Sequence, residues 1–247
     1  MPEKSKKIYF CIFLSLTVFF LHGSIGKAQR SFSQIPQFVF RNNEIDPEKP
    51  MVALTFDDGP GEGTERILDT LEKYGARATF FVMGENAENM KDVLKRQYEA
   101  GCEIGNHSYS HLSTEKLKKS RISAEFAKTD KIIKEITGSE AALVRPPFGR
   151  GDKKTSAAVN RPVILWSLDT LDWEVQDADK ICRTVFSSVH DGDIILMHDI
   201  FPSTAYACER LIPGLINRGF QLVTVGELME CRGIELLPGE VYNDGKG

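Results

Sequence analysis

The chain has 247 residues, of which 41% are hydrophobic and 27% are charged, a composition typical of a globular protein with a full core. Its formal net charge is −4, which excludes the strongly basic balance with which proteins neutralise nucleic-acid phosphates. We therefore expect one large folded domain, no long disordered region and no nucleic-acid partner.

The first 28 residues differ in kind from the rest of the chain. Lys4, Lys6 and Lys7 precede the apolar run Ile8–Leu21, and small residues follow it. Such a run is too short for a comfortable transmembrane helix and is typical of a signal-peptide core. We interpret residues 1–28 as a signal peptide or, alternatively, as an uncleaved N-terminal anchor that tethers the protein to a membrane. Either interpretation predicts a secreted or cell-surface protein.

After a polar lead-in segment at residues 29–50, short apolar runs alternate with amphipathic stretches. The expected strands are Met51–Phe56, Ala78–Met83, Cys102–Gly105, Ala141–Val144, Pro162–Ser167, Asp193–Met197 and Gln221–Val225. The expected helices are Thr64–Tyr74, Ala87–Ala100, Thr114–Ile136, Ala178–His190 and Thr204–Arg218. This alternation predicts βα units around a parallel sheet. We expect a single α/β domain at residues 51–232, a distorted (β/α)7-type barrel, followed by a polar tail at 233–247 with little structure.

The first strand leads into the sequence Thr55-Phe56-Asp57-Asp58-Gly59-Pro60. Two adjacent carboxylates repel each other, and in a packed site one tends to be protonated unless a cation neutralises it. Ordinary turn chemistry explains an Asp-Gly-Pro sequence equally well when it is taken alone. The pair His107 and His111 lies some fifty residues later, and an aspartate with two histidines is the ligand set of an open metal site.

Further polar residues follow the other expected strands. Arg145 follows the fourth strand, Asp169 and Asp172 follow the fifth, and His198 follows the sixth. In a βα barrel the carboxyl ends of the strands converge on one face, where active sites are built. We therefore expect these residues to meet the two aspartates and the two histidines.

Five segments in this order resemble the polysaccharide deacetylase family, the NodB-type carbohydrate esterases of family 4. The five are Thr55-Phe56-Asp57-Asp58-Gly59-Pro60, His107-Ser108-Tyr109-Ser110-His111, Arg145-Pro146-Pro147-Phe148-Gly149, Asp169-Thr170-Leu171-Asp172-Trp173 and Leu196-Met197-His198-Asp199. Each segment is weak alone, but together they span residues 51 to about 230. The resemblance implies a distorted barrel, in agreement with the strand pattern.

The resemblance also implies a metal site and an acyl-transfer chemistry. Asp58, His107 and His111 would bind a divalent metal, with Zn²⁺ expected and Co²⁺, Ni²⁺ or Mn²⁺ as alternatives. Asp57 would be the general base, oriented by a charged hydrogen bond from Arg145. The oxyanion would be held by the metal and by a backbone N–H near Phe148.

The remaining roles that the resemblance implies concern protonation of the leaving group and contact with the substrate. His198 would be the general acid, with Asp172 keeping it charged and oriented. Pro147, Phe148 and Trp173 would contact the substrate, although many relatives carry Tyr where this chain has Phe148. Several alternatives stay open. The two histidines could form a surface pair that binds no metal, and Asp57 could be a second metal ligand instead of the base. Asp172 could cap a helix, and Trp173 could be a core residue.

The function expected from this resemblance is a secreted, metal-dependent N-deacetylase of an N-acetylglucosamine polymer. Peptidoglycan is the leading substrate, and chitin oligomers come next. An O-acetyl esterase that acts on acetylated xylan would use the same site. A carbohydrate-binding protein without catalysis, or an iron oxygenase with two histidines and one carboxylate, are alternatives of other classes. We expect an N-acetylated glycan as the partner and no protein partner.

Overall fold

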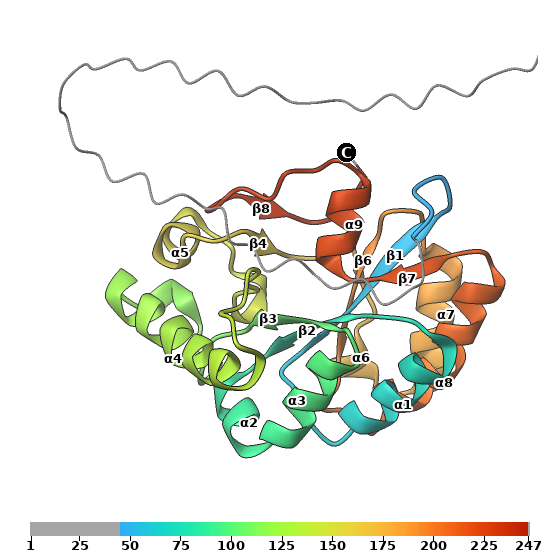
Figure 1. The fold of residues 1–247 in the computed structure, drawn as a ribbon, viewed down its shortest axis with the longest axis horizontal. Coiled ribbons are helices and arrows are strands. Elements are labelled where there is room, and N and C mark those ends of the chain that lie inside the picture. The colour runs from blue at the N-terminus through green and yellow to red at the C-terminus, as the bar shows by residue number, and fades with distance from the viewer. Residues whose placement is uncertain (1–44, 247) are drawn as a thin grey trace, which may run out of the picture. The chain divides into compact units, whose positions relative to one another are not determined.

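The computed structural model describes residues 45–246 and shows an α/β fold (Figure 1). The strands are β1 (Met51–Asp57), β2 (Thr79–Val82), β3 (Glu103–Asn106), β4 (Val163–Ile164), β5 (Leu168–Asp169), β6 (Ile194–His198), β7 (Gln221–Val223) and β8 (Val241–Tyr242). The α-helices are α1 (Thr64–Tyr74), α2 (Gly84–Asn89), α3 (Lys91–Glu99), α4 (Lys119–Thr137), α5 (Lys153–Val159), α6 (Asp172–Val175), α7 (Ala178–Ser188), α8 (Pro202–Asn217) and α9 (Val225–Cys231). Two 3₁₀ turns, η1 (Thr114–Lys116) and η2 (Pro147–Gly149), complete the described elements.

The main sheet is parallel and is built around β1. Its strands follow the order β3-β2-β1-β6-β5, and β7 pairs with the first half of β1. A second, two-stranded sheet pairs β4 with β8, and single bridges join Val144 to Asn106 and to Val163. This arrangement is an irregular and incomplete barrel, which confirms the predicted fold class.

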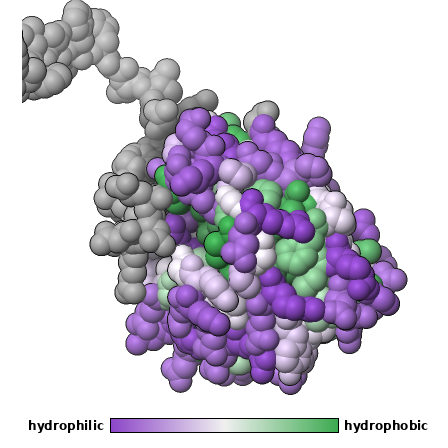
Figure 2. Space-filling model, turned by 90° about the vertical axis from the view of Figure 1, so that its right-hand side faces the viewer, coloured by the Kyte–Doolittle hydropathy of each residue, from purple (hydrophilic) through white to green (hydrophobic). Residues whose placement is uncertain are grey.

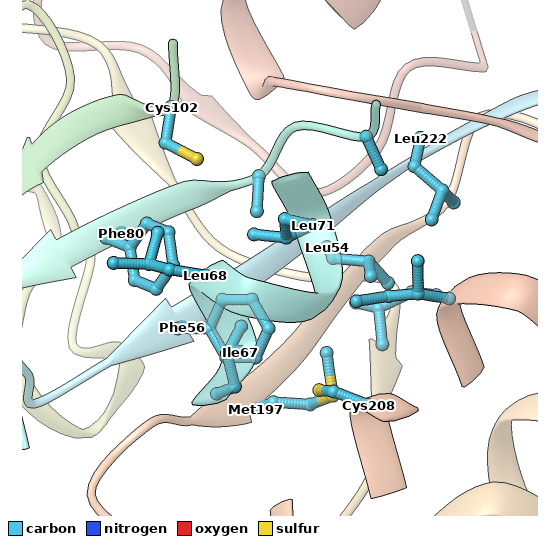
Figure 3. Close-up of a cluster of buried hydrophobic side chains, with 14 of the residues drawn as sticks. Leu54, Phe56, Ile67, Leu68, Leu71, Phe80, Cys102, Met197, Cys208 and Leu222 are labelled. Carbon is cyan, nitrogen blue, oxygen red and sulfur yellow. The ribbon is translucent and has the colours of Figure 1, made fainter. Parts of the chain in front are cut away.

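The core explains why β1 lies at the centre. All seven residues of β1 are buried, as expected for a parallel strand covered on both faces. In Figure 3, Phe56 of β1 lies beside Phe80 of β2 and Leu68 of α1, and the two phenylalanine rings stack with centroids 5.0 Å apart. Burying each such side chain stabilises the fold by roughly 1.5–3 kcal/mol. This packing fixes the position from which Asp57 and Asp58 leave the strand.

Several expected elements differ in the structure. The strand expected at 141–144 is reduced to the bridge at Val144, and the strand expected at 162–167 gives way to β4 and β5. The continuous helix expected over 114–136 is wrong, because Leu117 is extended (φ −85°, ψ 147°) and separates η1 from α4. Likewise, Met90 (φ −126°, ψ 48°) divides the helix expected at 87–100 into α2 and α3.

The expectation of little structure in the tail is also wrong. Residues 241–242 form β8, which pairs in parallel with β4. The Lys246 ammonium lies 2.6 Å from Oδ1 of the buried Asp193, and the Gly245 N–H donates to the Gly192 carbonyl at 2.8 Å. These partners are distant in sequence, so local composition did not reveal them.

Helix ends follow local sequence signals. Gly75 ends α1 in the left-handed conformation (φ 62°), which costs glycine no Cβ clash. Thr224 and Glu227 form a capping box at the start of α9, and Asp177 caps α7 through the backbone N–H groups of Asp179 and Lys180.

The surface viewed in Figure 2 is mainly hydrophilic, with an apolar area near its centre. Among residues 45–246, no helix combines the length and the apolar composition needed to cross a membrane. The predicted signal peptide or anchor at 1–28, and the lead-in segment as far as residue 44, lie outside the described residues.

Candidate active site

Three donor atoms lie together at the carboxyl ends of β1 and β3. The carboxylate of Asp58 and ring nitrogens of His107 and His111 all lie within 4.8 Å of one another. The Nε2 atoms of His107 and His111 lie 3.4 Å and 3.3 Å from Asp58 Oδ1. Asp58 Oδ1 is itself buried without a hydrogen-bond partner. Two imidazole nitrogens, one carboxylate and an unsatisfied buried oxygen fit a divalent cation.

A backbone contact fixes which nitrogen of His107 faces this cluster. Its Nδ1 lies 2.6 Å from the carbonyl oxygen of Arg145. Because a carbonyl only accepts, Nδ1 carries the hydrogen, and Nε2 keeps its lone pair for a ligand. Arg145 thus orients a predicted metal ligand through its main chain.

The loop that carries both histidines is anchored from β3 and α4. Asn106 Oδ1 accepts from the Ser108 N–H at 2.9 Å, and Glu125 Oε2 accepts from the Ser110 N–H and hydroxyl at 3.0 and 2.8 Å. Ser108 (φ 67°) and His111 (φ 53°) adopt left-handed backbone conformations that cost energy for residues with a side chain. The hydrogen bonds hold the loop in this strained shape.

Asp57 lies next to the cluster and is paired with a fully buried arginine. Arg145 Nη1 donates to Asp57 Oδ1 at 2.7 Å and to the Thr55 hydroxyl at 2.8 Å. The rest of the guanidinium donates to the carbonyl oxygens of Ile164 (3.0 Å) and Leu165 (2.7 Å). Burial lowers the pKa of Arg145, while the charge of Asp57 opposes this effect. Arg145 is therefore no ordinary surface ion pair, and it fixes one oxygen of Asp57.

The electrostatics of the cluster favour an ionised Asp58. Burial raises the pKa of Asp58, but the adjacent His107, with the charges of His111 and His198, outweighs it and lowers the pKa to about 2. For His107, burial opposes protonation, yet Asp57 and Asp58 raise its pKa. Burial and the neighbouring His107 lower the pKa of His111. An anionic Asp58 beside two imidazoles is the protonation state that a cation requires.

His198 is the last residue of β6 and is held by Asp172. Its Nδ1 lies 2.8 Å from Asp172 Oδ1, and its backbone N–H donates to Asp172 Oδ2 at 2.7 Å. The Thr204 hydroxyl donates to the same Oδ2 at 2.7 Å, and Asp172 is fully buried. Burial lowers the pKa of His198, but Asp172 outweighs it, and the pKa rises to about 9. Asp172 also accepts from the Trp173 N–H at 2.9 Å, but Leu171 is the N-cap residue of α6, so the Asp172 carboxylate mainly holds His198 and does not cap the helix.

The three residues expected to contact substrate have different exposures. Phe148 is 61% exposed and Trp173 is 49% exposed, so Trp173 is not a core residue, whereas Pro147 is buried. The Phe148 ring packs edge-on against His111 with centroids 4.6 Å apart, and its backbone is left-handed (φ 59°). The substrate contact of Pro147 stays a prediction that its burial does not support.

Several residues that support the candidate active site could not be identified as such from the sequence. Thr55 and Asp199 lie inside the five segments but had no assigned role, while Glu125 and Thr204 lie in helices outside them. Asp199 is fully buried, and burial raises its pKa to about 7. Asp169 accepts from the Leu171 N–H at 2.8 Å and so shapes the turn before Asp172. No periodicity or spacing marks the contacts of Thr55, Thr204 and Asp199, because each joins parts of the chain that are far apart in sequence.

The arrangement can activate and cleave a polar bond. A cation site, a buried carboxylate fixed by Arg145 and a protonated imidazole fixed by Asp172 are close enough to affect one another's charge, since Asp57 and Asp58 both raise the pKa of His198. Such a set offers a Lewis acid, a base and an acid.

Comparison with known proteins supports the resemblance. The family model for polysaccharide deacetylase matches residues 44–162. Over 78% of its length the chain is 37% identical to the peptidoglycan-N-acetylmuramic acid deacetylase PdaC of Bacillus subtilis, of which it spans only 41%. It is 35% identical to a peptidoglycan-N-acetylglucosamine deacetylase of Bacillus cereus, covering 74% of this chain and 69% of the relative.

A solved structure agrees with the fold over most of the described chain. The family 4 acetyl xylan esterase of Clostridium thermocellum, in complex with a cobalt ion, superposes with a TM-score of 0.74 at 34% identity, covering 78% of this chain and 98% of the esterase. The chain covers two thirds or more of the Bacillus cereus deacetylase and of the esterase at 34–35% identity, and it therefore belongs to the polysaccharide deacetylase family.

Proposed function

We propose that the chain is a metal-dependent deacetylase that removes acetyl groups from N-acetylglucosamine residues of peptidoglycan. The observation that carries the proposal is the placement of Asp57, held by Arg145 at 2.7 Å, beside the Asp58–His107–His111 cluster. A divalent metal held by Asp58, His107 and His111 would polarise the acetyl carbonyl and acidify the attacking water.

Asp57 acts as the base in this proposal. Its Oδ1 is occupied by Arg145, whereas its Oδ2 lies 3.7 Å from His107 Nε2 and faces the cluster. The water oxygen adds to the carbonyl carbon of the acetamide, and the water proton goes to Asp57. The buried guanidinium keeps Asp57 in one orientation through a charged hydrogen bond.

His198 acts as the acid. When the tetrahedral adduct collapses, the carbon–nitrogen bond breaks and the His198 proton passes to the leaving nitrogen, which yields acetate and a free amine. The hydrogen bond that His198 Nδ1 donates to Asp172 and the raised pKa keep His198 protonated at neutral pH. The Phe148 N–H has no hydrogen-bond partner among the described residues and is the proposed backbone donor to the oxyanion.

Peptidoglycan is favoured as the substrate because two relatives of this chain are named for it. We infer a secreted or cell-surface location for the same reason, with residues 1–28 as a signal peptide or tether. N-terminal sequencing of the protein recovered from cell fractions would separate these two fates. Zn²⁺ is the proposed metal, and elemental analysis of the purified protein would identify it.

Acetate release tests the proposal directly. The purified full-length chain should release acetate from peptidoglycan, and a chelator should abolish release until Zn²⁺ is restored. Release that survives complete metal removal would overturn the proposed chemistry.

A second candidate is an O-acetyl esterase, because one solved relative is named an acetyl xylan esterase. The same base and metal site would serve an ester, which has a better leaving group than an amide. Acetate release from acetylated xylan without release from peptidoglycan or from chito-oligosaccharide would favour this candidate.

A further inference from the structure

Near the candidate active site in the sequence, positive charge is concentrated in two short segments. Residues 114–121 and 150–154 together carry seven basic and two acidic side chains, a net charge of +5. Residues 45–246 as a whole carry 25 basic and 33 acidic side chains, a net charge of −8. We call these seven cations the basic surface: Lys116, Lys118, Lys119, Arg121, Arg150, Lys153 and Lys154.

Tertiary contacts bring the two segments to one face. Glu115 joins them twice, since its carboxylate lies 3.0 Å from Arg150 Nη1 and its carbonyl oxygen accepts from Lys154 Nζ at 2.7 Å. The hydroxyls of Thr155 and Thr114 are 3.0 Å apart, and α5 lies beside α4 (Figure 1). The basic surface is therefore one continuous area and not two separate runs of charge.

Arg121 pairs with Glu125 at 2.8 Å, but four of the seven basic side chains have no compensating partner among the described residues. Of the two acidic residues, Glu115 is paired with Arg150, and Asp152 caps α5 by accepting from the Thr155 N–H at 2.7 Å. Four exposed ammonium groups have no hydrogen-bond or ion-pair partner among residues 45–246, those of Lys116, Lys118, Lys119 and Lys153. Elsewhere, the described arginines Arg66 and Arg96 pair with carboxylates at 2.8 and 2.6 Å. Clustered, unpaired like charges create a local positive potential that attracts anions.

The basic surface is continuous with the site. The segment that begins at Thr114 follows the predicted ligand His111 by three residues. Arg150 follows Phe148 by two residues, and the exposed Phe148 ring packs on His111. A glycan strand with its acetamide at the site and its neighbouring sugars along Phe148 would therefore reach the basic surface.

We propose that the basic surface binds the carboxylates of a peptidoglycan strand and so selects an anionic glycan over neutral chitin. This inference rests on the proposed deacetylase function. Peptidoglycan carries the free carboxylates of its peptides, and lactyl carboxylates where no peptide is attached, whereas chitin carries none. Exposed charge pairs of this kind act mainly on encounter and affinity and little on the chemical step.

The test uses the full-length chain and a triple variant, Lys118→Gln/Lys119→Gln/Lys153→Gln. A matched control, Lys73→Gln/Lys95→Gln/Lys180→Gln, removes the same charge from exposed positions on α1, α3 and α7. On peptidoglycan stripped of phosphate polymers, the triple variant should raise KM roughly three- to tenfold with kcat unchanged. Its kinetics on neutral chito-oligosaccharide, and those of the control on both substrates, should stay within about twofold of the unmodified chain.

Salt and chemical neutralisation identify the attracting groups. Raising the salt above ~0.15 M, where the Debye length falls below about 8 Å, should raise the KM of the unmodified chain on peptidoglycan towards that of the triple variant. Amidating the peptidoglycan carboxylates should have the same effect. If the triple variant bound more weakly than the unmodified chain only to cell walls that still carry phosphate polymers, the assignment to carboxylates would be overturned.

Sedimentation with insoluble peptidoglycan separates this inference from the proposed function. If the chain released no acetate from any glycan, the proposed function would fail, but weaker sedimentation of the triple variant than of the control would still support the basic surface. Equal sedimentation and equal KM of the two variants would overturn it.

Discussion

The carboxylate of Asp199 occupies the space that a side chain at Gly59 would need, since a Cβ at position 59 would overlap both of its oxygens. Gly59 follows the predicted ligand Asp58, and Asp199 follows the predicted acid His198. Asp199 Oδ2 accepts from the Thr64 hydroxyl at 2.6 Å, and its carbonyl oxygen accepts from the Gly63 N–H at 2.9 Å. Gly59 is not in the left-handed region, so position 59 needs a glycine for space and not for conformation.

Replacing Gly59 should therefore displace the loop and weaken metal binding. We expect Gly59→Ala to lower Zn²⁺ affinity by ~10–100-fold, the range seen when groups that support metal ligands are lost. Adding Asp199→Ala frees the space, so the double variant should recover affinity relative to Gly59→Ala. Competition titration with a chromophoric chelator measures both.

Glu103 provides the matched control for Asp199. It is a second buried carboxyl with a pKa raised to about 7 by burial, and it accepts from the Thr79 hydroxyl at 2.9 Å and the Gly226 N–H at 3.0 Å. Glu103→Ala should lower stability but leave Zn²⁺ affinity unchanged and should not rescue Gly59→Ala. A rescue by Glu103→Ala would show that the loop responds to general loosening and not to Asp199.

His111→Ala should remove metal and activity together, because the cluster would keep only two of its three donors. Elemental analysis and acetate release measure the two effects on the same preparation. His190→Ala is the control, since the His190 side chain is 76% exposed and lies outside the cluster. Full activity with a full metal load in His111→Ala would contradict the ligand assignment.

Asp57→Asn should keep the metal and lower kcat by ~10²–10⁴-fold, because the amide keeps the shape but cannot take a proton. Asp169→Asn is the matched control, since Asp169 is also near Asp57 and its Oδ1 acceptor for the Leu171 N–H survives the change. We expect the control to keep most of its activity. If Asp57→Asn lost the metal instead, Asp57 would be a second ligand.

The Asp172–His198 pair predicts a specific dependence of stability on pH. The pKa of His198 is about 9 in the folded chain against about 6.5 when unfolded, so protonation favours the fold. Its contribution is fully present below about pH 6.5 and is lost as the pH rises through 9. Asp172→Asn should lower the pKa of His198, and NMR titration of its ring protons measures the shift.

Urea unfolding across pH provides the second readout for this pair. Between about pH 7 and 9 the unmodified chain should lose more stability than Asp172→Asn. Asp199 and Glu103, whose pKa values are both raised to about 7, reduce the stability of the fold mainly as the pH rises towards 7. Both residues are present in both chains, so the difference between the two chains isolates His198. Parallel stability curves above pH 7 would contradict the assigned partnership.

The motifs and the strand pattern predicted much of the fold and the residues that form the candidate site. The parallel sheet, the barrel class and the donor cluster Asp58–His107–His111 follow from residue types at the ends of apolar runs. The break at Leu117 and the docking of β8 did not follow, because they depend on contacts between residues far apart in sequence. Roles of individual site residues in catalysis stay predictions until the variants above are measured.

The sequence by itself determined which chemical groups the protein has and the order in which strands bring them to one edge, since apolar runs and turn residues are local properties. Only the tertiary structure decided which groups touch. The Arg145 carbonyl fixes the tautomer of His107, Asp199 fills the space at Gly59, and Glu115 joins the two halves of the basic surface. Each of these contacts depends on burial and distance between segments that are far apart in the chain, and these are set when the whole core packs.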